Sequence, residues 1–170
     1  MTDEPTNIDP RHFRDVLGCY PTGVCIVTAY ADDGARFGMV VGSFTSISLD
    51  PPLVGFFPDK KSTSWPRIAA TGHFCANILA ADQVHHSSRF ASRAEDKFEG
   101  MDHGFSPYGQ PLLDNVLAWV DCSIASVIDI GDHLLVVGAV RSLEKRDEGT
   151  PLLFFRGSYH YLTDSMGADQ

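Results

Sequence analysis

Short apolar runs with a period near two, separated by turn residues, dominate the first half of the chain. Residues 22–30 (TGVCIVTAY) and 36–41 (RFGMVV) are rich in β-branched and aromatic side chains and flank the turn signal at 32–34, so they predict a β-hairpin. Residues 43–49 (SFTSISL) intersperse apolar side chains with serines, and 53–57 (LVGFF) form a continuous apolar run. We interpret both as strands, the second of them buried.

The second half repeats this pattern with one interruption. Residues 73–80 (HFCANILA) predict a strand, and 117–127 (LAWVDCSIASV) and 133–140 (HLLVVGAV) are expected to pair across a turn at Asp129–Asp132. The final apolar run, PLLFFRGSYHYL, ends the ordered chain. Between them, residues 95–115 are polar, contain glycine and lack periodicity, so we expect a loop there.

Three short segments have helical features. Residues 10–19 place Phe13, Val16 and Leu17 on one face. The segment Trp65–Thr71 follows a serine, has proline in its first turn and stops at a glycine, and ADQVHHSSRFAS predicts another short helix. Many strands, short turns and few small helices favour a mainly β fold, a closed or nearly closed barrel.

Length and composition narrow the class of protein. A chain of 170 residues is expected to form a single domain, with residues 1–8 and 163–170 as flexible tails. The net charge of −9 and the lack of a basic run argue against a nucleic-acid partner. The apolar runs fall short of the roughly 20 residues that span a bilayer. The acidic N-terminus is not that of a signal peptide, so we expect no membrane association.

The four cysteines, Cys19, Cys25, Cys75 and Cys122, form no C-x-x-C pair, and three of them lie in apolar runs. Buried free thiols are therefore favoured over disulfides or zinc, which suits a reducing, cytoplasmic compartment. The neighbours His85 and His86 would diverge by about 100° on a helix, so we interpret them as solvated side chains and expect no metal site.

Two segments are candidates for ligand binding. KKSTSWP places two lysines and several hydroxyls where a helix begins, which suits a phosphate, although Ser64 could instead simply cap its own helix. Gly38 and Gly42 bracket a strand end. Glycine there would let a flat ligand approach the backbone, or would mark a bend in a barrel strand.

Six segments, in this order, resemble the short-chain flavin reductase family: GSFTSISLDPPLVGFF, STSW, GHFCANILAADQ, SSRFAS, DKFEG and GDHLLVVGAV. The resemblance implies a split β-barrel of the flavin-reductase-like, FMN-binding kind. It also implies an NAD(P)H-dependent flavin reductase that transfers hydride from NADH or NADPH to FMN or FAD. Such enzymes supply reduced flavin to a partner monooxygenase, and the resemblance further implies a homodimer with flavin near the interface.

Carried over by position, the resemblance implies a complete set of flavin contacts. The isoalloxazine ring and ribityl chain would lie against Gly38, Met39, Val40, Gly42 and Ser43, followed by Phe57 and Pro58. The phosphate would be held by Ser62, Ser64 and Arg89, with Phe90 packed beside it. His133 would face the nicotinamide. Where the family often has polar side chains this chain has Val40, Val41 and Gly42, which leaves only backbone N–H groups for the ring and leaves FMN or FAD open.

Two other functions remain open on the residues. One is a non-catalytic protein that binds or stores flavin, which would not need a histidine turn facing a nicotinamide. The other is a barrel oxidase acting on a phosphate-bearing ring such as a pyridoxine phosphate, which would call for more basic residues than Lys60, Lys61 and Arg89.

Hydride transfer from a nicotinamide to a flavin needs stacked rings with the reacting atoms about 3–3.5 Å apart. It needs no general base, in keeping with the lack of a catalytic dyad in this sequence.

Overall fold

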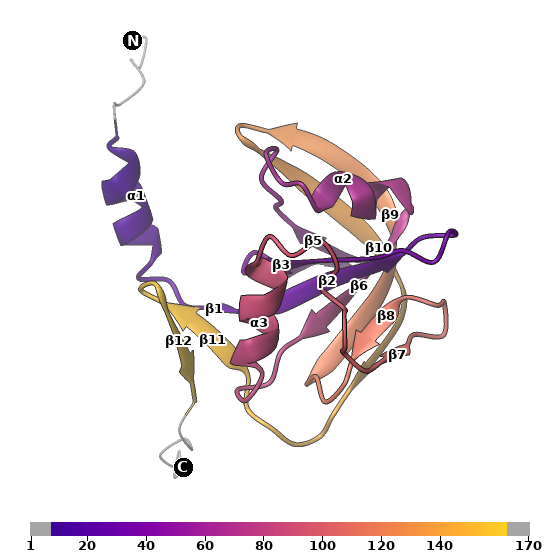
Figure 1. Cartoon of the computed structure of the whole chain (residues 1–170). Helices are drawn as coiled ribbons and strands as arrows, with labels where there is room; N and C mark the ends of the chain where they lie inside the picture. The colour runs from indigo at the N-terminus through magenta and orange to yellow at the C-terminus, as the bar shows by residue number, and fades with distance from the viewer. Residues whose placement is uncertain (1–7, 163–170) are drawn as a thin grey trace.

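The computed structural model describes residues 8–162, and its main feature is one antiparallel sheet (Figure 1). The strand order is β3-β2-β6-β9-β10-β5-β4. The bounds are Cys25–Tyr30 for β2, Arg36–Val41 for β3, Thr45–Leu49 for β4, Pro52–Phe56 for β5, His73–Ile78 for β6, Ala118–Ile130 for β9 and His133–Lys145 for β10. The predicted hairpins β2–β3 and β9–β10 are confirmed, the second turning at Gly131 and Asp132.

The connection between β3 and β4 shows why this sheet curls. These strands lie at opposite edges of the sheet, yet only Gly42–Phe44 join them. Seven flat strands would place the edges about 29 Å apart at roughly 4.8 Å per strand. The linker can span only about 14 Å. The sheet must therefore bend until its edges approach, which produces a barrel that stays open between β3 and β4. The predicted split β-barrel is confirmed.

Two small sheets accompany the barrel. The first joins β1 (Thr22–Gly23), β11 (Leu152–Phe155) and β12 (Ser158–Tyr161), so the last apolar run is a hairpin rather than one strand. The second pairs β7 (His103–Phe105) with β8 (Pro111–Leu113) inside the segment predicted to be a loop. That prediction was wrong because strands of three residues are too short to show an alternating pattern.

The three predicted helices are confirmed as α1 (Pro10–Leu17), α2 (Trp65–Ala70) and α3 (Val84–Ala91). Helix α2 places Trp65 and Ile68 in the barrel core, and Figure 1 shows α3 in front of β2. Helix α1 stands apart from the barrel in the same view and buries none of its side chains. Among the described residues, no helix is long and apolar enough to cross a membrane.

Strand β2 is buried on both faces, which explains its nearly continuous apolar sequence. Alternate residues Cys25, Val27 and Ala29 point into the barrel, where Phe56 packs edge-on against Trp65 and Phe74. The opposite face contributes to a second core outside the barrel, made of Val24, Ile26, Leu79, Phe90, Phe98, Leu113, Val116 and Leu152. Because α3 packs through this outer core, the position of α3 is fixed relative to β2 and β3.

Strand β4 differs from its neighbours because its apolar side chains face outward. Leu49 is 90% exposed and Ile47 is 46% exposed, although the strand pairs with β5. A register shift between Ser46 and Ser48 interrupts the pairing.

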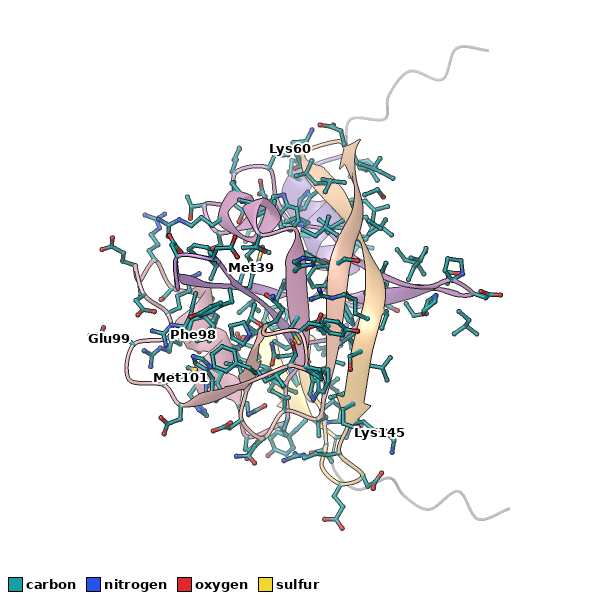
Figure 2. All side chains as sticks on the ribbon, turned by 90° about the vertical axis from the view of Figure 1, so that its right-hand side faces the viewer. Met39, Lys60, Phe98, Glu99, Met101 and Lys145 are labelled. Atoms are coloured by element: carbon teal, nitrogen blue, oxygen red, sulfur yellow. The ribbon has the colours of Figure 1, made fainter. Side chains whose placement is uncertain are left out.

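Figure 2 shows Lys60 and Lys145 at opposite ends of the long β9–β10 hairpin, with Phe98, Glu99 and Met101 on the side away from it.

Candidate functional site

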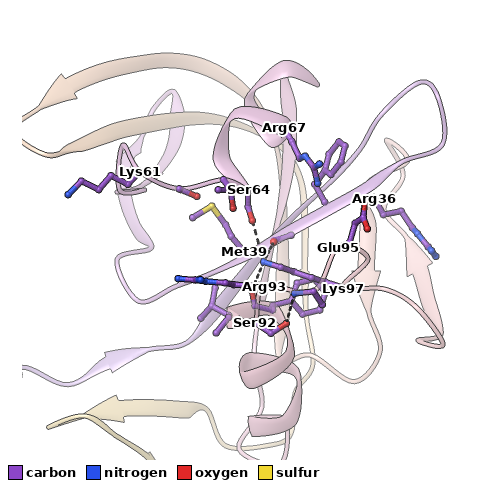
Figure 3. A pocket seen from close by; sticks show the side chains of 17 residues that line it. Arg36, Met39, Lys61, Ser64, Arg67, Ser92, Arg93, Glu95 and Lys97 are labelled. Carbon is purple, nitrogen blue, oxygen red and sulfur yellow. Dashed lines mark hydrogen bonds between the residues drawn. The ribbon is translucent and has the colours of Figure 1, made fainter.

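A cleft of about 810 Å³ lies between strand β3, the start of α2 and the segment that follows α3 (Figure 3). It brings together several residues that the sequence predicted for a flavin: Gly38, Met39, Val40, Ser62, Ser64 and Phe90. These residues come from three separate parts of the chain. The barrel and the outer core hold all three walls in place, because Ile68 of α2 and Phe90 of α3 are both buried.

The cleft is lined by basic side chains although the chain as a whole is acidic. Five of them, Arg36, Lys61, Arg67, Arg93 and Lys97, line it together with a single carboxylate, Glu95. The net charge of the protein is −9, so this concentration of positive charge is local. It favours an anionic ligand.

Three of these cations are free to pair with a ligand. Arg36 forms an ion pair with Asp96 at 3.1 Å. By contrast, Lys61, Arg67 and Arg93 have no ion-pair partner within residues 8–162. Arg67 instead lies over the ring of Phe37, with its guanidinium carbon 5.6 Å from the ring centroid. A bound anion would therefore meet side chains that it does not have to take from existing ion pairs.

The two serines at the start of α2 have different roles from those expected. Ser62 Oγ accepts a hydrogen bond from the backbone N–H of Trp65 at 3.1 Å, so Ser62 caps the helix. Ser64 has helical backbone angles and makes no capping bond. The alternative that Ser64 merely caps its own helix is therefore wrong. Because α2 has only six residues, the hydroxyls and cations suit an anion here more than the helix end does.

Lys97 is a site residue that sequence reasoning missed. Its Nζ donates to the carbonyl oxygens of Phe90 (2.7 Å) and Gly38 (3.2 Å) and to Ser64 Oγ (3.3 Å), at the centre of the view in Figure 3. Burial lowers the pKa of this ammonium group. The only signal was the segment DKFEG, which belongs to the resemblance but suggested no role for its lysine.

Gly38 is required by packing, whatever ligand the cleft holds. A Cβ built on it would lie 2.5 Å from Cδ1 of Phe90 and closer still to Cε1. Phe90 is 1% exposed and packs edge-on against Phe98. The aromatic ring of α3 therefore gives a packing reason for glycine at this position, while Gly38 also lines the cleft as predicted for a flavin contact.

The structure places Arg89 outside the cleft. Its Nε donates to the carbonyl oxygen of Lys97 at 2.7 Å, and its Nη2 donates to that of Glu99. These bonds hold the segment that carries Lys97 against α3. In this part of the chain the arginine that lines the cleft is Arg93, four residues further along and just beyond the end of α3. The sequence could not separate the two, because both follow the same run of polar residues.

The remaining predicted residues form a second group beside the turn of the β9–β10 hairpin. Ser43 Oγ accepts a hydrogen bond from the backbone N–H of Phe57 at 2.9 Å. The carbonyl oxygen of Pro58 accepts from Leu134 N–H, and the following residue forms a β-bridge with His133. Gly42 precedes Ser43 at the end of β3. None of these residues lines the cleft itself. The segment 57–64 connects them to Ser62 and Ser64.

His133 has one ring nitrogen engaged and one available. Its Nδ1 lies 2.7 Å from Oδ1 of Asp132, and the side chain is 43% exposed. This hydrogen bond lowers the pKa of Asp132. Nearby, Lys60 Nζ donates to Asp129 Oδ1 and to the carbonyl oxygen of Gly131, both at 2.6 Å, which holds the turn against segment 57–64. The turn thus presents Nε2 of His133, which makes no hydrogen bond within residues 8–162, from a fixed position.

Comparison with known proteins identifies the family. A family model described as "Flavin reductase like domain" matches residues 17–163. The chain belongs to the flavin reductase-like domain family. It is 54% identical over 152 residues to a flavin reductase from Pseudomonas putida, covering 89% of each chain. It is 51% identical over 152 residues to the flavin-dependent monooxygenase reductase subunit HsaB from Rhodococcus jostii, covering 89% of this chain and 77% of that protein.

A solved structure shows that the similarity extends to the fold. The NADH:FAD oxidoreductase SgcE6 from Streptomyces globisporus, in complex with NAD and FAD fragments, superimposes with a TM-score of 0.88 at 30% identity. The alignment covers 94% of this chain and 98% of that one. The split barrel of this flavin reductase-like chain is therefore shared over nearly its whole length.

The residues of the cleft fit a phosphorylated flavin. Two hydroxyls and three unpaired cations suit the phosphate, while the exposed edge of β3 offers backbone groups beside Met39 and Val40.

The thiols of this flavin reductase-like chain are not part of the cleft. Cys25, Cys75 and Cys122 are free and buried, as predicted, whereas Cys19 is exposed. Burial raises the pKa of Cys122 to about 12. No metal-binding group occurs in the part of the chain that the structure describes.

Proposed function

We propose that this protein is an NAD(P)H-dependent flavin reductase that uses FMN or FAD and supplies reduced flavin to a partner monooxygenase. The cleft along β3 carries the proposal, because its hydroxyls and unpaired cations match a flavin phosphate in an otherwise acidic chain. Membership of the flavin reductase-like family and the names of its relatives support the reaction and the partner. Flavin, when bound, accepts the hydride.

The proposed contacts follow the cleft from the phosphate to the ring. Ser62 and Ser64 donate to the phosphate, and Arg93 adds a charge-assisted bond in the place first expected for Arg89. Met39 and Val40 lie against the ribityl chain and the edge of the ring. The wall is fixed before binding, because both cores of the protein pack behind it.

The end of the site near the hairpin would hold the ring and the nicotinamide. Ser43 and Phe57 are hydrogen-bonded there, with Gly42 and Pro58 next to them in the chain, and we propose that all four contact the isoalloxazine ring. His133 Nε2 would donate to or accept from the nicotinamide carboxamide. With valines in β3, the ring is held by backbone groups and apolar contacts alone, which suits a flavin that must leave after reduction.

A reductase assay tests this function directly. Purified protein should oxidise NADH or NADPH under anaerobic conditions only when FMN, FAD or riboflavin is present, with each nicotinamide and flavin tested in every pairing. The absence of turnover in all pairings, together with retained flavin binding, would favour the storage alternative. Oxidation of pyridoxine phosphate with flavin as the electron acceptor and without any nicotinamide would instead favour the third candidate. The partner role is tested by product formation when a flavin-dependent monooxygenase is supplied with reduced flavin only through this protein.

We also propose that the protein is a homodimer. Helix α1 has eight residues, and its apolar side chains Phe13, Val16 and Leu17 are 54%, 53% and 52% exposed. Helices shorter than about 12–15 residues are marginal in water by themselves, so α1 needs a surface that covers this face. A second copy is the simplest partner, because most homo-oligomers are twofold symmetric. Light scattering should give twice the chain mass. Leu17→Asp should give a monomer, and Arg14→Ala on the polar side should not.

The single domain over residues 1–170 and the cytoplasmic location remain proposals. Both cores share strand β2, which supports one folding unit, although residues 1–7 and 163–170, including most of the predicted tails, lie outside the described residues. The three buried free thiols support a reducing compartment.

A further inference from the structure

We infer that Lys97 is a positioning residue that orients the Ser64 hydroxyl as a donor into the cleft and so sets its preference for a phosphorylated flavin. The inference rests on the proposed function and adds a residue and a recognition rule to it. Figure 3 shows the Lys97 ammonium group beneath Ser64, joined to its hydroxyl by a hydrogen bond.

Lys97 cannot itself bind a ligand without breaking bonds within the protein. An ammonium group has three N–H donors and no acceptor. Nζ of Lys97 has three acceptors within reach, the carbonyl oxygens of Phe90 and Gly38 and the hydroxyl oxygen of Ser64, at 2.7, 3.2 and 3.3 Å. These acceptors belong to α3, β3 and the start of α2, so one charge links all three walls. Any influence on a bound flavin therefore passes through these neighbours.

The bond to Lys97 determines which way the Ser64 hydroxyl can donate. Because Lys97 only donates, Ser64 Oγ must accept, and its own proton is left for another partner. Over residues 8–162, Ser64 Oγ makes no other hydrogen bond, and in particular it makes no side-chain capping bond to α2. Ser62 is in the same position, since its Oγ accepts from Trp65 N–H. Both hydroxyls are therefore donors facing the cleft that they line, which matches an acceptor-only phosphate.

The charge of Lys97 makes this arrangement dependent on pH. While Lys97 is protonated, Ser64 can only accept from it. Burial lowers the pKa of Lys97, so deprotonation begins below the usual lysine range. A neutral amine can accept from Ser64, which allows the hydroxyl proton to turn away from the cleft. The other charged groups that face Lys97 across the cleft are Arg36, Lys61, Arg67, Arg93 and Glu95.

The experiment compares the dissociation constants of FMN and riboflavin, which share the ring but differ in the phosphate. Flavin fluorescence quenching measures both without turnover, so it tests the inference even if the reductase proposal fails. Lys97→Met should weaken FMN about tenfold, the loss of roughly one charge-assisted hydrogen bond, and should change riboflavin less than about threefold. Ser64→Ala should give a similar FMN loss, and the double variant should lose no more than either single variant.

The pH profile gives an independent readout that does not require Lys97 to be replaced. In the unaltered protein the ratio of FMN to riboflavin affinity should fall as pH rises toward the lysine range. Ser64→Ala should abolish this fall, and Lys61→Met, a matched loss of an exposed cation in the same cleft, should retain it. A fall that persists in Ser64→Ala would overturn the inference. So would equal losses of FMN and riboflavin in Lys97→Met, or additive losses in the double variant.

Discussion

Replacing Gly38 by alanine should destabilise the protein through a single methyl group. The new Cβ would lie 2.5 Å from Cδ1 of Phe90, whereas ordinary carbon contacts are about 3.5–4.0 Å. The ring of Phe90 cannot simply move away, because it is 1% exposed and packs edge-on against Phe98 with the centroids 5.0 Å apart. The strain must therefore be taken up by β3 or α3, which are two walls of the cleft.

The expected change in the free energy of unfolding for Gly38→Ala is the difference between two opposing contributions. Overpacking a well-packed core costs about 1–3 kcal/mol. Replacing glycine by alanine also restricts the unfolded chain, which offsets about 0.4–1 kcal/mol where the backbone angles suit alanine. Gly38 is not among the glycines with positive φ, so this offset applies. We expect a net loss of about 1–2 kcal/mol, which corresponds to a melting temperature about 2–8 °C lower.

Urea unfolding of a double-mutant cycle tests whether Phe90 is the cause. Phe90→Leu removes the ring atoms that the new methyl group would meet, so Gly38→Ala should cost little in that background. The coupling between the two changes should be about 1 kcal/mol or more. The flavin Michaelis constant should rise in Gly38→Ala and recover partly in the double variant. An unchanged stability of Gly38→Ala, or the same loss with and without Phe90, would refute the reasoning.

Four further predictions concern residues outside the cleft wall. Arg89→Ala should weaken FMN and riboflavin equally, since the guanidinium holds backbone carbonyls rather than the phosphate; a loss confined to FMN would contradict this. A thiol reagent should modify only Cys19 quickly in the native protein and all four cysteines in denaturant, because burial raises the pKa values of the others. Arg141→Met should cost about 3–5 kcal/mol in urea unfolding by leaving the buried carboxylate of Asp121 unpaired, and replacing both partners by apolar residues should recover most of it. His133→Ala should raise the Michaelis constant of the nicotinamide about tenfold or more with flavin affinity unchanged, and unaltered kinetics would leave His133 a rim residue.

Local pattern was sufficient for most of the strands and for the three helices. In β2 and β3 the β-branched side chains and the turn between them specify a hairpin without help from the rest of the chain. The features that local pattern missed are those with too few residues to show a period, such as β7 and β8. For β4 the pattern predicted a strand correctly but could not show that Ile47 and Leu49 face outward, because burial depends on what lies opposite.

The residues of the candidate site likewise fall into those that the sequence predicts and those that need the structure. Ser62 and Ser64 could be found from the sequence because a hydroxyl-rich segment before a helix is a local signal, and the family resemblance added Met39 and Val40. The choice between Arg89 and Arg93 needed the structure, since the direction of a side chain at the end of α3 depends on which carbonyls lie within reach.

The sequence by itself determined a mainly β chain with a phosphate-binding segment, because strand, turn and cap preferences act between residues near one another in the chain. Only the tertiary structure decided that the sheet closes and that five cations converge on one cleft of an acidic protein. Lys97 shows the physical reason. Its hydrogen-bond partners Ser64 and Gly38 lie 33 and 59 positions away, and no local pattern records a contact that exists only after the barrel has closed.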